Sequence, residues 1–216
     1  MNEIEIKKTN KILNYESTLK LMEERVNNIL NNSENELIWF LNHDHIYTQG
    51  TSSSDEDIIK KNRTKILKTN RGGKTTYHGP GQRIVYFLLN LNKRRKDIRE
   101  FVNIIERSVI EFLQCYNIEA TSFKDRVGIW VTKVNKKTLI KEEKIGAIGL
   151  RVTKWITYHG LSFNINPKLE YYEDINPCGL KGYKNTSLKN LGVMINNNDF
   201  DIQFEKIFLR NLKNFN

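Results

Sequence analysis

Residues 71–82 read Arg-Gly-Gly-Lys-Thr-Thr-Tyr-His-Gly-Pro-Gly-Gln, and the strongly apolar run 84–91 follows almost directly. Paired glycines allow the backbone to come close to a ligand, and neighbouring N–H groups can surround an oxygen or a phosphate. An apolar run of this length, bounded by glycine and proline, is typical of a buried strand. The stretch therefore predicts a ligand-binding loop that leads into a core strand.

Two common phosphate-binding motifs do not fit this stretch. Gly73-Lys74-Thr75 resembles part of a P-loop, but Lys68 stands where that motif requires a glycine. The stretch also lacks the GxGxxG fingerprint that opens a helix in dinucleotide-binding folds. His78 is then either a hydrogen-bonded structural histidine or a side chain of a substrate pocket.

The spacing of apolar residues predicts the elements around this stretch. Helical spacing indicates helices over residues 15–30, over 97–115 behind an Asp97 cap, and over 200–215 behind an Asp199 cap. Apolar runs indicate strands at 37–41, 66–69, 84–91, 127–131, 145–150, 155–158 and 161–165. The charged segment 133–143 is expected to be an exposed hairpin or a flexible loop.

Strands and helices mix without regular alternation along the 216 residues. This order favours an α/β fold of the mixed α+β kind, with a mixed β-sheet flanked by helices, over a doubly wound parallel sheet. The length suits one domain over residues 1–216 with a sizeable core. The longest apolar run is too short to span a bilayer and the N-terminus lacks a signal peptide, so we expect a cytoplasmic protein.

The net charge of +10 favours an acidic partner, but a solvated lysine-rich surface explains it equally well. No nucleic-acid motif is present, and we expect neither nucleic acid nor a membrane as a partner. His43 and His45 form an H-x-H pair, yet a third ligand at reliable spacing is missing, so no metal site is expected.

The chain has two cysteines, and their settings differ. Cys115 falls on the apolar side of the second predicted helix, which places it in the core. Cys178 stands in Asn176-Pro177-Cys178-Gly179, where proline and glycine favour a turn. A thiol exposed in a turn suits a nucleophile, although a small apolar side chain filling the turn is the alternative. A disulfide between the two is not expected.

Four motifs, in order, resemble those of the lipoyl(octanoyl) transferases: residues 71–82, 144–152, 158–161 and 175–180. The resemblance implies the fold shared by biotin and lipoate protein ligases. It also implies transfer of an octanoyl or lipoyl group from acyl carrier protein to a lysine, without a cofactor. The implied acceptors are the lipoyl domains of 2-oxoacid dehydrogenase E2 subunits and the glycine cleavage H protein.

By the same resemblance, Cys178 is the acyl-thioester nucleophile and Lys144 its activating base. Without it, Lys144 would be interpreted as a solvated surface lysine at the end of a charged run. His159 supports Cys178, lines the pocket or is structural. The substrate pocket would be lined by Arg71, Gly72, Gly73, Lys74, Thr75, Thr76, Tyr77, His78, Ala147, Ile148, Gly149, Gly160, Leu161 and Ser162.

Turn amides near Gly72-Gly73, or at Gly179, are candidates for holding the tetrahedral oxyanion. Lys74 departs from the family, which commonly has Gln or Asp at this position. Two other functions remain alternatives: an ATP-dependent lipoate-protein ligase of the same fold, which would not require Cys178, and a non-enzymatic basic binding protein.

Overall fold

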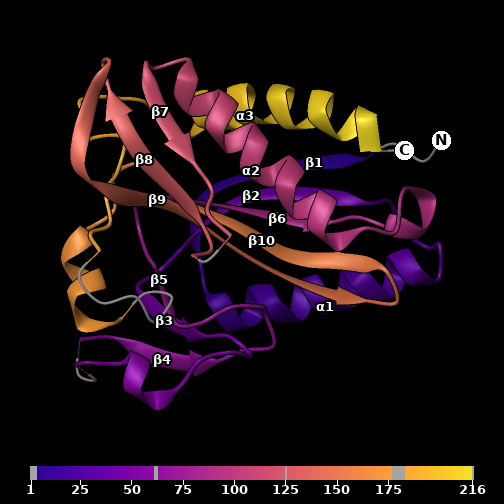
Figure 1. The fold of residues 1–216 in the computed structure, drawn as a ribbon. Coiled ribbons are helices and arrows are strands. Elements are labelled where there is room, and N and C mark those ends of the chain that lie inside the picture. The colour runs from indigo at the N-terminus through magenta and orange to yellow at the C-terminus, as the bar shows by residue number, and fades with distance from the viewer. Residues whose placement is uncertain (1–3, 61–62, 125, 177–182, 216) are drawn as a thin grey trace.

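The computed structural model describes residues 4–60, 63–124, 126–176 and 183–215, and it is built on a seven-stranded sheet (Figure 1). Strand β1 pairs with β2 in parallel, and the other neighbours in this sheet are antiparallel. The expected mixed sheet is thus confirmed. Its strands, in spatial order, are β1 (Glu5–Leu13), β2 (Leu37–His43), β6 (Gln82–Leu88), β10 (Ile156–Asn164), β9 (Lys137–Thr153), β8 (Ile129–Val134) and β7 (Ile118–Thr121).

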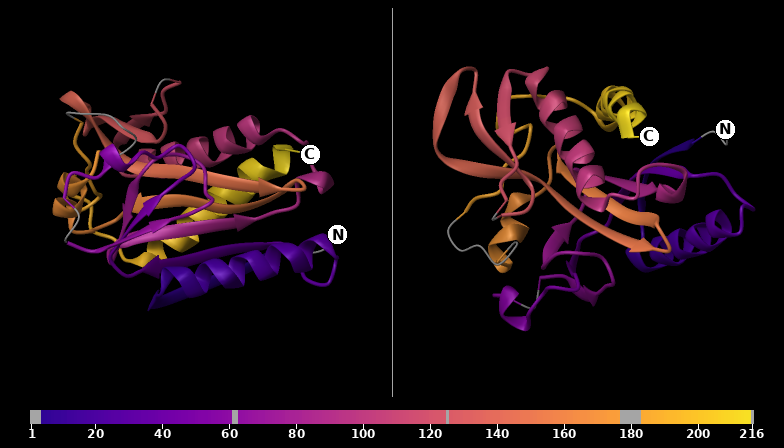
Figure 2. Two further views of the ribbon diagram at one scale, coloured as in Figure 1. Left: turned by 90° about the horizontal axis from the view of Figure 1, so that it is seen from below. Right: turned by 45° about the vertical axis from the view of Figure 1, so that its right-hand side comes forward.

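Helices cover both faces of this sheet (Figure 2). Helices α2 (Ile98–Gln114) and α3 (Asn197–Leu212) pack on one face, where Phe87 and Phe163 of the sheet meet aromatic side chains of both helices. Helix α1 (Tyr15–Leu30) packs on the other face. A small sheet of β4 (Lys65–Lys68), β3 (Ile46–Gln49) and β5 (Thr76–His78) lies on that same side (Figure 1). Short 3₁₀ helices complete the fold: η1 (Asp55–Asp57), η2 (Leu91–Lys93), η3 (Leu169–Asp174) and η5 (Lys213–Phe215).

Side-chain caps begin the three long helices. The Asn14 side chain accepts the Ser17 N–H before α1, and Asp97 accepts the Glu100 N–H before α2, as predicted. The predicted Asp199 cap of α3 is wrong, because Asn196 is the capping residue. Asp199 instead completes a reciprocal capping box with it. Within the described ranges, no helix combines the length and apolarity needed to cross a membrane.

Cys115 is exposed, so the prediction that it lies in the core is wrong. Helix α2 ends at Gln114 and Cys115 forms its C-cap, with its thiol directed at the Glu111 carbonyl at 3.5 Å. The last buried residues of the helix are Phe112 and Leu113. With 3.6 residues per turn, a position three residues after Phe112 no longer lies on the buried face, so Cys115 points to solvent.

The observed strands differ from the predicted ones at several points. The runs 155–158 and 161–165 form one continuous strand, β10. The hairpin expected at 133–143 is confirmed, since this segment belongs to the β8–β9 hairpin, whose turn has positive φ at Asn135 (48°) and Lys136 (67°), as a two-residue hairpin turn requires. Strands β1, β3, β5 and β7 were not predicted. In β1, the lysine-rich sequence lies at the sheet edge and buries little.

Candidate active site

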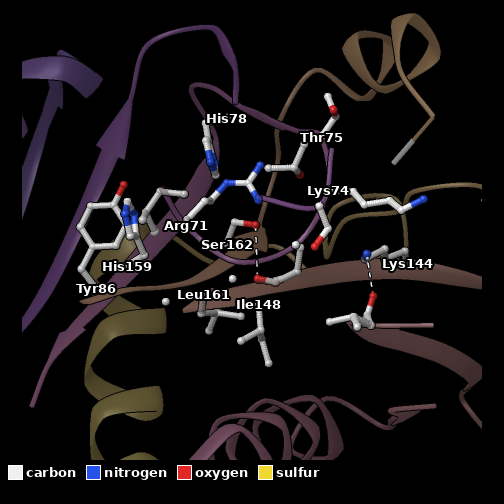
Figure 3. Close-up of a pocket in the computed structure, with 18 of the residues that line it drawn as sticks. Arg71, Lys74, Thr75, His78, Tyr86, Lys144, Ile148, His159, Leu161 and Ser162 are labelled. Carbon is white, nitrogen blue, oxygen red and sulfur yellow. Dashed lines mark hydrogen bonds between the residues drawn. The ribbon is translucent and has the colours of Figure 1, made fainter. Parts of the chain in front are cut away.

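A cavity of about 300 Å³ lies between strands β6, β9 and β10 and the segment 71–78 (Figure 3). Lys74 and Lys144 lie at one end, and Tyr86 and His159 at the other, with Ile148 and Leu161 between them. Most of the predicted pocket residues line this cavity: Arg71, Gly73, Lys74, Thr75, Thr76, His78, Ala147, Ile148, Gly149, Gly160, Leu161 and Ser162.

Gly72 holds the loop against the sheet. Its N–H donates to the Leu150 carbonyl of β9 at 3.0 Å, and a Cβ on Gly72 would lie only 2.7 Å from that oxygen. A Cβ on Gly149 would likewise meet the Gly72 carbonyl at 2.8 Å. Glycine is therefore required where loop and strand touch. Because the Gly72 amide is already bonded, it is not available to an oxyanion, and that part of the expectation is corrected.

Tyr77 points away from the cavity, so the expectation that it lines the pocket is also corrected. Successive side chains of a strand alternate between its faces. In β5, Thr76 and His78 therefore face the cavity, and Tyr77 lies between Tyr171 and Tyr47 with its hydroxyl 2.8 Å from His45 Nδ1.

Arg71 fixes the start of the loop to the small sheet. Its side chain is buried, and its guanidinium donates to the Thr48 hydroxyl at 3.1 Å, to the Thr48 carbonyl at 2.5 Å and to the Gly72 carbonyl at 2.9 Å. Several bonds to one backbone segment leave the guanidinium little freedom. Arg71 therefore shapes the cavity wall.

Lys144, on β9, is buried, with 4% of its surface exposed. Its ammonium donates to the Val127 carbonyl at 2.8 Å and lies 5.5 Å from the centre of the Trp130 ring. The alternative of a solvated surface lysine is therefore wrong. A Cβ on Gly128 would lie 2.4 Å from Lys144 Cε and 2.9 Å from its Nζ, so this side chain packs directly on the backbone of a glycine.

The backbone of Lys144 holds the chain that follows residues 177–182. Its N–H donates to the Lys184 carbonyl at 2.8 Å, and its carbonyl accepts the Thr186 N–H at 2.8 Å. Upstream, the Asn176 N–H donates to the Asp57 carbonyl at 2.7 Å. Cys178 and Gly179 lie outside the described residues. The chain on the C-terminal side of that segment is nevertheless anchored at Lys144.

Three buried histidines lie near the far end of the cavity, which is the end opposite Lys144. Burial lowers the pKa of His43 to about 4 and that of His159 to about 3, and it lowers the pKa of His78 well below its ordinary value. The three imidazoles are therefore neutral near pH 7. His159 lies at the opposite end from Lys144, which favours its pocket-lining interpretation over support of a nucleophile beside Lys144 (Figure 3).

The H-x-H pair does not converge. His43 Nε2 lies 2.8 Å from the Tyr86 hydroxyl, whereas the ring of His45 stacks on Tyr171 at 4.4 Å. Across the described ranges, no group of three or more His, Cys, Asp or Glu side chains has the arrangement of a metal site.

Sequence reasoning missed several residues that line the cavity: Tyr15, Ser52, Ile84, Tyr86, Arg126 and Val127. One signal was present, since Tyr86 places a hydroxyl within residues 84–89, whose other side chains are all apolar, and a buried polar atom needs a partner. Tyr15 and Arg126 carried none, because their positions depend on how α1 and the segment before β8 pack.

The sequence of this chain matches a family of known proteins over most of its length. A family model described as the lipoyl protein ligase A/B catalytic domain matches residues 14–209. The octanoyltransferase of Bartonella henselae is 41% identical over 213 residues, which span 95% of this chain and 87% of the relative.

Solved structures share the fold at low identity. LipL1 of P. falciparum, in complex with lipoate, superposes with a TM-score of 0.69 at 17% identity, covering 98% of this chain and 63% of that chain. The biotin protein ligase of Aquifex aeolicus, in complex with biotin and ATP, superposes with a TM-score of 0.55 at 15% identity, covering 100% and 72%. The expected fold of lipoate and biotin protein ligases is confirmed.

Proposed function

The chain belongs to the octanoyltransferases within the lipoyl protein ligase A/B catalytic domain family, and we propose that it transfers an octanoyl or lipoyl group to a lysine of a lipoyl domain. One observation carries the proposal. A buried lysine, Lys144, stands at one end of a largely apolar cavity, and its backbone binds Lys184 and Thr186, which follow the Cys178 segment. Nucleophile and base would then act at the mouth of an acyl-binding cavity.

In the first half-reaction, the Cys178 sulfur attacks the carbonyl carbon of an acyl thioester on the carrier protein. A new C–S bond forms to Cys178, the old C–S bond breaks, and the thiol proton passes through Lys144 to the departing carrier thiolate. One thioester replaces another, so the step needs no ATP. A Lys144 ammonium also stabilises the Cys178 thiolate before attack.

In the second half-reaction, a lysine amine of the acceptor domain attacks the Cys178 thioester. A C–N bond forms, the C–S bond breaks, and the amine proton passes through Lys144 to the cysteine. An amide is more stable than a thioester, so this step is downhill. The proposed donor is octanoyl-acyl carrier protein, and the proposed acceptors are lipoyl domains of 2-oxoacid dehydrogenases and the glycine cleavage H protein.

The covalent step is tested by intact mass after mixing the chain with octanoyl pantetheine thioester and no ATP. We expect a gain of one octanoyl group, which Cys178→Ala abolishes. Cys115→Ala is the matched control, because Cys115 is an exposed thiol on the C-cap of α2 and should leave the gain intact. Normal turnover by Cys178→Ala, or transfer that requires ATP, would exclude the covalent mechanism and favour a ligase.

The role of Lys144 is tested by single-turnover kinetics of both halves. Lys144→Ala should slow acylation of Cys178 and transfer onward by about 10²-fold or more, the range typical of a lost general base. If Lys144→Ala acylates Cys178 as fast as the unmodified chain across pH 6 to 9, Lys144 has no role in the first step.

A further inference from the structure

The far end of the cavity is more polar than an alkyl chain requires. Tyr86, His78 and His159 line it, all three are buried, and Ile148 and Leu161 lie between them and Lys144 (Figure 3). An octanoyl chain ends in a methyl group, which can satisfy no hydrogen bond. The imidazoles at this end have no task in the transfer reaction described above.

The hydrogen-bond network fixes the proton of His159 on Nε2. Asn70 donates its amide N–H to the Glu23 carboxylate at 3.2 Å, because a carboxylate only accepts. The Asn70 carbonyl oxygen therefore faces His159 Nε2, at 3.1 Å, and that nitrogen must donate. Since burial lowers the pKa of His159 to about 3, the ring is neutral and Nδ1 carries a lone pair.

No hydrogen-bond donor in the described part of the chain reaches that lone pair. His159 is 1% exposed, and its Nδ1 has no hydrogen-bond partner among the residues that the structure describes. A buried acceptor without a donor is unfavourable and is rare in folded proteins. Because His159 lines the cavity, a ligand bound there is a source of the missing donor.

His78 presents a second acceptor by the same reasoning. Gln82 donates its amide N–H to Asn164 Oδ1 at 3.0 Å, so its carbonyl oxygen faces His78 Nδ1, at 2.8 Å. His78 Nδ1 therefore donates, which leaves Nε2 of the neutral ring as the acceptor. Tyr86 does not supply the missing proton, because its hydroxyl donates to His43 Nε2 at 2.8 Å, the other nitrogen of His43 donating to the Leu13 carbonyl.

The backbone of His159 is strained. Its φ is +59°, in the left-handed region, although it lies within strand β10. Such conformations are uncommon for a residue other than glycine and persist where surrounding structure enforces them, often at binding sites. The ring packs against Tyr86 at 5.8 Å and Tyr158 at 5.2 Å, which hold it in this position.

We propose that the far end of the cavity is a subsite for a hydrogen-bond donor at the distal end of the acyl chain. A hydroxyl is the simplest such donor, with His159 Nδ1 as its first acceptor and His78 Nε2 as its second. The proposal rests on the proposed function, in that this cavity takes the acyl chain. It adds the class of hydroxyacyl groups to the substrates of the site.

Binding of free acids to the unmodified chain tests the subsite without any transfer. Isothermal titration would compare octanoic acid with its derivatives hydroxylated at carbon 4, 6, 7 or 8. A hydroxyl at carbon 4 falls in the middle of the cavity, beside the apolar Ile148 and Leu161 and the Ser162 hydroxyl, which already donates to the Ala147 carbonyl (Figure 3), and should weaken binding by about tenfold or more. A hydroxyl at carbon 7 or 8 should weaken it by less than about threefold, or strengthen it.

The outcomes separate the two proposals. Equal weakening at every position would overturn the subsite and leave the acyl cavity standing. Absence of binding by octanoic acid itself would overturn both. Binding of octanoic acid with tolerance confined to the distal hydroxyls supports the subsite.

A variant identifies the acceptor. His159→Asn keeps a residue that tolerates left-handed φ but withdraws the imidazole. The ratio of transfer rates from 8-hydroxyoctanoyl and octanoyl pantetheine thioesters should fall by about five- to tenfold, the effect of one lost hydrogen bond. His45→Asn is the matched control, because His45 stacks on Tyr171 and should leave the ratio unchanged. An unchanged ratio in His159→Asn would overturn the assignment of His159.

Discussion

Lys144 can pack against residue 128 only because that residue is glycine. Gly128 has a φ of +122°, and a Cβ there would lie 2.4 Å from Lys144 Cε and 2.7 Å from the Gly146 carbonyl. Neither the backbone of β9 nor the strand pairing beside it can move far, so the lysine side chain must give way. Gly128 therefore sets the position of the proposed base.

Gly128→Ala should slow octanoyl transfer by about 10²-fold, since a displacement of about 1 Å in a reacting group can have this effect. Stability should fall by about 1–3 kcal/mol, because alanine is strained at positive φ. Single-turnover acylation and urea unfolding measure the two effects separately.

Gly192→Ala is the control for backbone strain. Gly192 also has positive φ, at +83°, but a Cβ there would meet nothing within 4 Å. It should lose stability while keeping its transfer rate. Equal losses of rate in the two variants would mean that Gly128 acts through the fold and not through Lys144.

The residue scale also shows why some site predictions succeeded. Ordered motifs in the sequence named Ala147, Ile148 and Gly149, which do line the cavity. Tyr77 was misplaced because a motif gives the order of residues and not the face of the strand to which each one points. The burial of Lys144 could not be predicted, because it depends on side-chain contacts with Val127 and Gly128 that form when β8 and β9 pair.

At the scale of elements, local signals were sufficient for helices and weaker for strands. Helix α1 was predicted with its observed bounds, Tyr15–Leu30, because its apolar spacing and its ends are local properties. Strand β1 was missed because it pairs with β2 residues 30 or 32 positions away and buries little of its own surface. Sheet edges are defined by tertiary partners, which a single sequence does not display.

One buried ion pair joins three elements. Arg83 of β6 donates to both oxygens of Asp201 of α3, at 2.8 and 2.5 Å, and to the Thr9 carbonyl of β1 at 2.9 Å. Both charged side chains are almost completely buried. Removing one partner would leave the other charge buried and unpaired.

Asp201→Asn should therefore lower the free energy of unfolding by about 3–5 kcal/mol, measured by urea denaturation. The exposed pair of Lys133 and Glu119, at 2.8 Å, provides the control. Glu119→Gln should cost about 1 kcal/mol or less, because solvent screens such pairs. Similar losses in both variants would mean that the buried pair between β6 and α3 contributes no more to the free energy of unfolding than an exposed pair does.

At the scale of the whole molecule, the charge of +10 acquires a physical role if both partners are acidic, as the family resemblance implies for acyl carrier protein and lipoyl domains. Exposed Lys74 lines the cavity at the end that holds Lys144, and exposed Lys184 is hydrogen-bonded through its carbonyl to Lys144. In the proposed mechanism, donor and acceptor reach the same cysteine in turn, so one basic surface around this end would attract both.

Such attraction acts over about 8–10 Å at physiological salt and weakens as salt is raised. The apparent second-order rate with carrier and lipoyl-domain substrates should therefore fall several-fold from low to high salt, while the rate with octanoyl pantetheine thioester barely changes. Lys184→Glu should slow the protein substrates more than Lys137→Glu, which makes the same charge change on an exposed lysine next to the β8–β9 turn. If both substrate types lose activity equally with salt, and the two variants behave alike, the lysine-rich composition rather than docking accounts for the charge.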